Sequence, residues 1–280
     1  MVAGSARRRR VSARGATRRA KNSTLMSALG RAGLAARGVM YILIGVIAVQ
    51  IAFGSTNQKA ESTGAVRLVA ANPFGSVLLW LLAIGFAGLT LWRLSEAIWG
   101  SSEPDGHKAT KRLGAAVRAI IYGFLTFSIL KYALGLGAPS SSNKQSQDLT
   151  AKALQLPGGQ VLVAIVGIVI AAVGLYIAYQ AWKKKFLRQM RMGSASATTR
   201  KTVERLGQVG GIARGAVFAT AGIFLVVAAV NANPGQAKGV DSALRALART
   251  PLGPWLLVLV ALGLVTFGIF SLCQARWQDV

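Results

Sequence analysis

The chain has 280 residues, of which 53% are hydrophobic and 15% are charged. Soluble domains carry about 25% charged residues, so this composition points away from a water-soluble domain. One cysteine and one histidine exclude an intramolecular disulfide and a zinc site of Cys and His ligands, which needs about four of them. With 8 acidic residues against 33 basic ones, we also expect no carboxylate-rich metal site and no cofactor.

The formal net charge of +25 raises the question of nucleic-acid binding. The basic residues lie at the ends of apolar runs, and the sequence has no stripe of basic and aromatic residues of the kind found on RNA-binding sheets. We therefore expect no nucleic-acid partner and attribute the charge pattern to membrane topology.

The amino-terminal segment 1–30 is rich in Arg, Ala and Ser and has no apolar periodicity. This composition predicts a disordered, polybasic tail. The first apolar run starts after Arg37, which is late for the apolar region of a cleaved secretory signal. The first helix is therefore expected to remain in the mature protein.

Six apolar runs follow the tail and predict six membrane-spanning helices, since roughly 17–25 apolar residues cross a bilayer as a helix. The third and fifth runs are the shortest, and they reach this length with the small residues that precede them. In chain order the runs are Gly38–Phe53, Phe74–Ile98, Ala119–Leu134, Val161–Trp182, Ala216–Val230 and Leu252–Ala275.

The odd-numbered runs share one motif and the even-numbered runs share another. Each odd run begins with Gly-x-x-x-Arg-[Gly/Ala]-x-x-[Tyr/Phe], which places small residues and the Arg on one face of a helix. Pro-x-Gly lies at the entrance to each even run, where the Pro is expected to open the helix, and Glu or Gln followed by Ala lies near the end of the run. Small residues on a shared face let helices approach closely in lipid. The marker residues are Arg37, Arg118 and Arg214 in the odd runs, and Pro73, Pro157, Pro251, Glu96, Gln180 and Gln274 in the even runs.

These motifs predict an all-α membrane protein, in which six transmembrane helices form three parallel two-helix repeats with a pseudo-three-fold arrangement. Short amphipathic stretches before the even runs are expected to form helices on the outer surface. The predicted segments are a tail (1–30), repeat 1 (31–100), repeat 2 (111–185), a basic linker (186–204) and repeat 3 (205–278), and the amphipathic stretches are Ala65–Ala71, Leu149–Leu156 and Ala243–Ala248.

The basic residues also predict the orientation in the membrane. Of the 33 basic residues, 25 fall on the side that carries both termini and 8 on the other. Basic residues concentrate on the cytoplasmic side of membrane proteins, so we expect a multi-pass plasma-membrane protein with both termini in the cytoplasm. The cluster Lys183–Lys185 would then face anionic lipid headgroups, which we expect as partners beside the bilayer itself.

Together, the three copies of both motifs resemble one family of bacterial membrane proteins, the family that contains domain of unknown function 1206. The resemblance covers about Arg31 to Trp277. The family has a two-helix module that occurs three times, and its members are found mainly in actinobacteria. The resemblance therefore implies a bacterial plasma membrane, and it implies no particular activity.

Arg37, Arg118 and Arg214 are the candidate pathway or structural residues, because ionisable groups in membrane spans are functional candidates. They could form a ring that selects anions. Alternatively, each lies near the cytoplasmic interface and extends toward lipid phosphate, which the sequence favours because each Arg starts its helix. A further hypothesis pairs each Arg with the acid or amide that ends its own repeat, namely Arg37 with Glu96, Arg118 with Gln180 and Arg214 with Gln274.

Three classes of function were weighed against these features. A structural or regulatory membrane component fits the small-residue faces and the scarcity of polar residues in the spans, and the sequence favours it. A transporter or channel for anions or small solutes, with a pathway along the pseudo-three-fold axis, is the alternative. We expect no enzyme, since His107 lies in a polar loop and no Ser/His/Asp or paired-carboxylate set can be assembled at one depth. No catalytic, cofactor-binding or metal-binding residue is therefore predicted.

Overall fold

The protein is described by a computed structural model in which all regular elements are helical over the described residues (24–54, 59–100, 107–137, 141–193, 195–239, 241–242, 244–245 and 252–278). The α-helices are α2 (Thr24–Ala52), α3 (Ser62–Ala70), α4 (Gly75–Trp99), α5 (Ala109–Ala133), α6 (Ser142–Leu154), α7 (Gly159–Trp182), α8 (Ala197–Val230) and α10 (Gly253–Trp277). Two 3-10 turns, η1 (Lys185–Gln189) and η2 (Pro234–Gln236), lie in the connections.

Six of these helices, α2, α4, α5, α7, α8 and α10, are long and apolar enough to cross a membrane. They coincide with the six predicted runs, and each second helix of a repeat ends at a Trp, as expected for an interfacial belt. The predicted boundaries were wrong in two places. Residues 24–30 belong to α2 and not to the tail, whose first 23 residues lie outside the described part, and α8 already starts at Ala197 inside the predicted basic linker.

The predicted outer helices are present, and they explain the Pro-x-Gly motif. Pro73 was expected to open α4, but α4 begins two residues later, at Gly75. A Cβ added at Gly75 would lie 2.5 Å from the carbonyl oxygen of Ala70, because α3 turns back sharply into α4 there. The motif therefore specifies a tight turn between the short helix and the span, and only glycine fits its last position. Of the third predicted stretch, 243–248, residues 244–245 are described and helical, as are residues 241–242 just before it.

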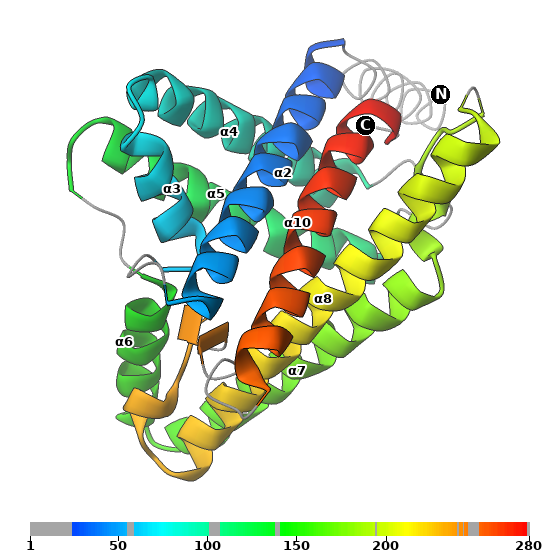
Figure 1. The fold of residues 1–280 in the computed structure, drawn as a ribbon. Helices are drawn as coiled ribbons and strands as arrows, with labels where there is room; N and C mark the ends of the chain where they lie inside the picture. Colours follow the sequence, from blue (N-terminus) through cyan, green and yellow to red (C-terminus); the bar gives the residue numbers. More distant parts are fainter. Residues whose placement is uncertain are drawn as a thin grey trace, which may run out of the picture.

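The spans pack in a cyclic order that joins one repeat to the next. Each second helix packs extensively against the first helix of the following repeat: α4 against α5, α7 against α8, and α10 against α2. Figure 1 shows α2, α10, α8 and α7 side by side in that order. Within the repeats, α2 packs on α4 and α8 packs on α10, whereas α5 and α7 scarcely touch. The pseudo-three-fold arrangement is therefore real but incomplete in repeat 2.

Small residues make the tight contacts of this bundle, as the motif predicted. A Cβ added at Gly38 would lie 2.8 Å from the carbonyl oxygen of Gly268, and one added at Gly268 would lie 2.7 Å from that of Gly38. In the same way Gly215 faces Gly174 at the junction of α8 and α7, where an added Cβ would lie 2.6 Å from a carbonyl oxygen. The backbones thus approach closely at both junctions, which is how helices associate without a hydrophobic driving force between them.

Candidate functional site

Arg37 lies at the point where the three repeats meet. Its guanidinium donates from Nε to Ser271 Oγ (3.2 Å) and from Nη2 to Gln274 Oε1 (2.6 Å), both on α10, and from Nη1 to Tyr122 Oη on α5 (3.5 Å). The close α2–α10 contact at Gly38 holds the Arg37 side chain against α10. Arg37 is buried, so the expectation that it extends toward lipid phosphate was wrong: its hydrogen-bonding groups are directed into the protein.

The expected Arg37–Glu96 pair is also wrong. Glu96 Oε2 accepts instead from Arg93 Nη1 at 2.6 Å, one helical turn earlier on α4. The amide expected to pair with Arg214, Gln274, is bound to Arg37. The reason is the cyclic packing: each second helix packs more extensively on the first helix of the next repeat than on the first helix of its own repeat.

The same cyclic rule applies to Arg118. This residue is exposed, and Glu96 of the preceding repeat lies within its electrostatic range. Gln180, the expected partner, is on α7, and α7 does not pack against α5. The expected Arg118–Gln180 pair therefore has no structural basis.

Arg214 completes the group from the third repeat. Its guanidinium carbon lies 5.0 Å from the ring centroid of Phe267 and 5.8 Å from that of Tyr41. The guanidinium carbon of Arg37 lies 5.5 Å from the same Phe267 centroid, so this ring is close to two guanidinium groups. A guanidinium over an aromatic face within about 6 Å is attracted by the ring quadrupole.

Four arginines therefore meet inside the spans: Arg37, Arg93, Arg118 and Arg214, all within electrostatic range of neighbours in the group. We call them the arginine cluster. Among the described acidic residues, Glu96 is the one that lies with them. Two buried guanidinium atoms, Arg93 Nε and Arg214 Nε, have no hydrogen-bond partner among the described residues. The cluster thus holds more positive charge than the described protein neutralises.

The depth of the cluster follows from helix geometry. At 1.5 Å per residue, the three repeated arginines lie about 22–24 Å from the carboxy-terminal ends of their helices. The apolar layer of a bilayer is about 30 Å thick. If the helix ends mark one boundary, the arginines lie inside the apolar layer, toward the side on which the first helices begin.

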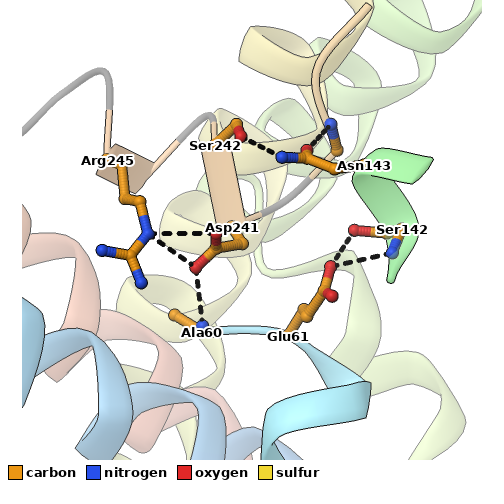
Figure 2. A network of polar contacts seen from close by, with 8 residues as sticks. Ala60, Glu61, Ser142, Asn143, Asp241, Ser242 and Arg245 are labelled. Carbon is orange, nitrogen blue, oxygen red and sulfur yellow. Dashed lines mark hydrogen bonds and ion pairs between the residues drawn. The ribbon is translucent and has the colours of Figure 1, made fainter. Parts of the chain in front are cut away.

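A second polar site closes the opposite end of the bundle, and it is also cyclic. Figure 2 shows three acceptor side chains, one from each repeat, that each bind a backbone N–H of the next repeat. The bonds are Ser142 N to Glu61 Oε2 (3.1 Å), Gly239 N to Asn143 Oδ1 (2.6 Å) and Ala60 N to Asp241 Oδ1 (2.8 Å). We call this arrangement the outer ring, after the side of the membrane on which the sequence predicts it.

Additional side-chain bonds reinforce the outer ring. The Ser142 hydroxyl donates to Glu61, Asn143 donates to Ser242, and Arg245 pairs with Asp241 at 3.1 Å. Burial raises the pKa of the Glu61 carboxyl above its ordinary value, and the nearby Asp241 carboxylate raises this pKa too, while the bonds from Ser142 and the charge of Lys59 oppose the rise. Glu61 Oε1 is buried and has no partner among the described residues. Burial therefore disfavours the charged form of Glu61.

Sequence reasoning found part of these sites. The repeated motif identified Arg37, Arg118 and Arg214, but it missed Arg93, although a charge inside an apolar run is a visible signal. Tyr122 is the aromatic residue of this motif in repeat 2, and no role was predicted for it. The outer ring was missed as well. The available signal was a polar acceptor beside the start of each short helix, which becomes recognisable only when the repeats are aligned in space.

Comparison with known proteins agrees with the repeat structure. The family model described as "Domain of Unknown Function (DUF1206)" matches residues 32–100, 113–184 and 209–278, one match for each two-helix unit. The chain is 29% identical over 256 residues to an uncharacterized protein of Bacillus subtilis, YxxB, and the match covers 90% of each chain. No solved structure matches the chain. The protein is therefore a multi-pass membrane protein that belongs to the DUF1206 family, with three copies of that domain.

Proposed function

We propose that this protein binds an anionic group within the membrane through the arginine cluster, in a bacterial plasma membrane and with both termini in the cytoplasm. The observation that carries the proposal is the charge balance: four guanidinium groups and one described carboxylate, Glu96, lie together inside apolar spans. An unneutralised charge within the membrane is costly, and a bound anion would offset that cost. The role is binding without covalent chemistry, and it needs no metal or cofactor.

The geometry supports anion recognition in two further ways. Arg37 is fixed in orientation by Ser271 and Gln274, and fixed donors bind an anion without further ordering cost. Arg93 Nε and Arg214 Nε are buried donors without a partner among the described residues. Guanidinium groups match the geometry of carboxylate and phosphate oxygens.

A structural or regulatory role, which the sequence favours, is the second candidate. The observation in its favour is that Arg37 joins α2, α5 and α10 through neutral partners. A purely structural cluster would hold the bundle together without any ligand. The two candidates differ in whether an anion stabilises the folded protein.

The test is a melting experiment on the full chain in uncharged detergent. An anion that binds only the folded state stabilises it by about 2.7 kcal/mol at a hundredfold excess over its dissociation constant. We expect inorganic phosphate, sulfate or a short-chain anionic lipid to raise the melting temperature of the wild-type protein. Arg37→Gln should abolish the rise, and Arg118→Gln, a change at an exposed position, should reduce it.

The matched control is Lys131→Gln, which removes an exposed basic residue of α5 outside the cluster. Phosphate and sulfate stabilise many proteins by exclusion from their surface, and that general effect should be equal in all variants. An equal response of the wild-type protein, Arg118→Gln and Lys131→Gln to every anion would overturn the proposal and leave the structural role.

A further inference from the structure

The three repeats differ at one junction. In repeats 1 and 3 the second helix packs on its own first helix, but in repeat 2 α7 stands apart from α5. The space around the first glycine of the motif differs between the repeats in the same way. A Cβ added at Gly33 would lie 2.5 Å from Leu89 Cβ, and one added at Gly210 would lie 2.5 Å from Phe267 Cα, whereas one added at Gly114 would meet nothing within 4 Å.

Equivalent positions on the second helices show the same break. Leu89 and Phe267 are 0% and 5% exposed, and their counterpart Val173 is 47% exposed. One turn later, Trp92 and Phe270 are 4% and 3% exposed, and their counterpart Tyr176 is 58% exposed. The face of α7 that should cover α5 is therefore uncovered.

The sequence gives a physical reason for this break. In repeats 1 and 3 a Gly on the second helix faces an Ala on the first, Gly85 against Ala36 and Gly263 against Ala213. The corresponding residues of repeat 2 are Val169 and Val117, and both are exposed. Two β-branched side chains cannot occupy the space of a Gly and an Ala, so the close approach is lost. α5 and α7 therefore stay apart, and we call the region between their exposed apolar side chains the opening.

The exposed side of α5 also carries one member of the arginine cluster. Arg118 lies on α5 next to Val117, is exposed, and is within electrostatic range of Arg93 and Arg214. Its counterpart Arg37 is buried against α10. The repeated arginine is thus exposed in repeat 2, as Arg118, and buried in repeat 1, as Arg37.

We propose that this opening is the binding site of a phospholipid with an anionic headgroup, whose phosphate is held by Arg118 and whose acyl chains lie against Val169, which is nearer the middle of the bilayer than Arg118. The proposal rests on the function proposed above and specifies the ligand. The apolar sides of the opening lie at the depth of the bilayer, so a molecule that combines a negative headgroup with hydrocarbon matches both surfaces. A small water-soluble anion would match the charge alone.

The test uses the full chain in nanodiscs of phosphatidylcholine with a minor fraction of phosphatidylglycerol. After release into detergent, native mass spectrometry counts the lipids that remain bound. We expect phosphatidylglycerol to be enriched several-fold over its fraction in the nanodisc on the wild-type protein. Arg118→Gln should bring the enrichment close to onefold, and Lys131→Gln should leave it unchanged.

A second variant tests the opening itself. The double change Val117→Ala with Val169→Gly restores the small pair of repeats 1 and 3, so α7 should close onto α5. We expect this variant to lose the enrichment while it keeps all four arginines. Its melting temperature in detergent, measured beside the wild-type value, verifies that it is folded.

Unchanged enrichment in both Arg118→Gln and the closing variant would overturn the proposal. So would an equal loss in Lys131→Gln, because it would mean that general charge attraction retains the lipid. If phosphate or sulfate stabilises the protein through Arg37 but phosphatidylglycerol is not enriched, the lipid proposal fails and anion binding stands. If phosphate and sulfate do not stabilise the protein through the arginine cluster, and phosphatidylglycerol is not enriched, both proposals fail.

Discussion

The break in the pseudo-three-fold arrangement can be measured with one substitution made at three equivalent positions. Gly33, Gly114 and Gly210 start the same motif in the three repeats. Changing each to Ala adds one methyl group and leaves the charge unaltered. The structure predicts opposite outcomes, because the added Cβ meets the backbone or Cβ of a neighbouring helix at two of these positions and open space at the third.

The magnitudes follow from two effects of opposite sign. Ala is better than Gly inside a helix by about 1 kcal/mol, and this gain is common to all three variants. Overpacking costs about 1–3 kcal/mol. It applies to Gly33→Ala and Gly210→Ala, where the nearest atoms lie at 2.5 Å and cannot be moved by rotating a side chain. Gly114→Ala should therefore stabilise by about 1 kcal/mol, and Gly33→Ala should be less stable than Gly114→Ala by about 1–3 kcal/mol.

Thermal unfolding in detergent measures these differences, since 1 kcal/mol shifts the melting temperature of a chain of this size class by about 2–4 °C. The helix-propensity gain is the same at the three equivalent sites, so the difference between the variants measures the free-energy cost of overpacking. A Gly114→Ala protein that is destabilised as much as Gly33→Ala would refute the reasoning, because α5 and α7 would then pack as closely as the helices of the other repeats.

Three further predictions follow from the sites. A double-mutant cycle between Arg37→Gln and Gln274→Leu should give a coupling of about 1–3 kcal/mol, and one between Arg37→Gln and Glu96→Gln should lie within about 0.5 kcal/mol of zero; the reverse order would restore the pairing within repeat 1. Because the pKa of Glu61 is raised in the folded protein, its stabilising contribution is complete below the unfolded pKa and is lost as pH rises through the folded pKa. Acidification from neutral pH should therefore raise the melting temperature of the wild-type protein more than that of Glu61→Gln, and equal pH dependence would contradict the assignment. In intact cells and a Cys273→Ala background, an impermeant thiol reagent should label Asn72→Cys and not Thr198→Cys; labelling of the second alone would invert the topology.

Much of the fold was predictable because its signals are local. Runs such as Phe74–Ile98 predicted spans by length and hydropathy alone, and the repeated motifs set the number of units. The faces that carry Gly38 and Gly215 were predicted to contact protein, and both do. On the equivalent face of repeat 2, Ala119 is buried as predicted, but Gly114 meets no neighbour. The start of α4 at Gly75 was missed because the turn depends on how α3 folds back.

The sequence by itself determined the six spans, the three repeats and the identity of the repeated arginines, because hydropathy and helical periodicity are properties of one segment at a time. Only the tertiary structure decided that Arg37 binds Gln274, that Glu61, Asn143 and Asp241 form a ring, and that Arg118 remains exposed. Each of these outcomes depends on which helix of which repeat becomes the neighbour. That choice is made by packing between segments far apart in the chain: α10 closes onto α2 through Gly268 and Gly38, while Val117 and Val169 keep α5 and α7 apart.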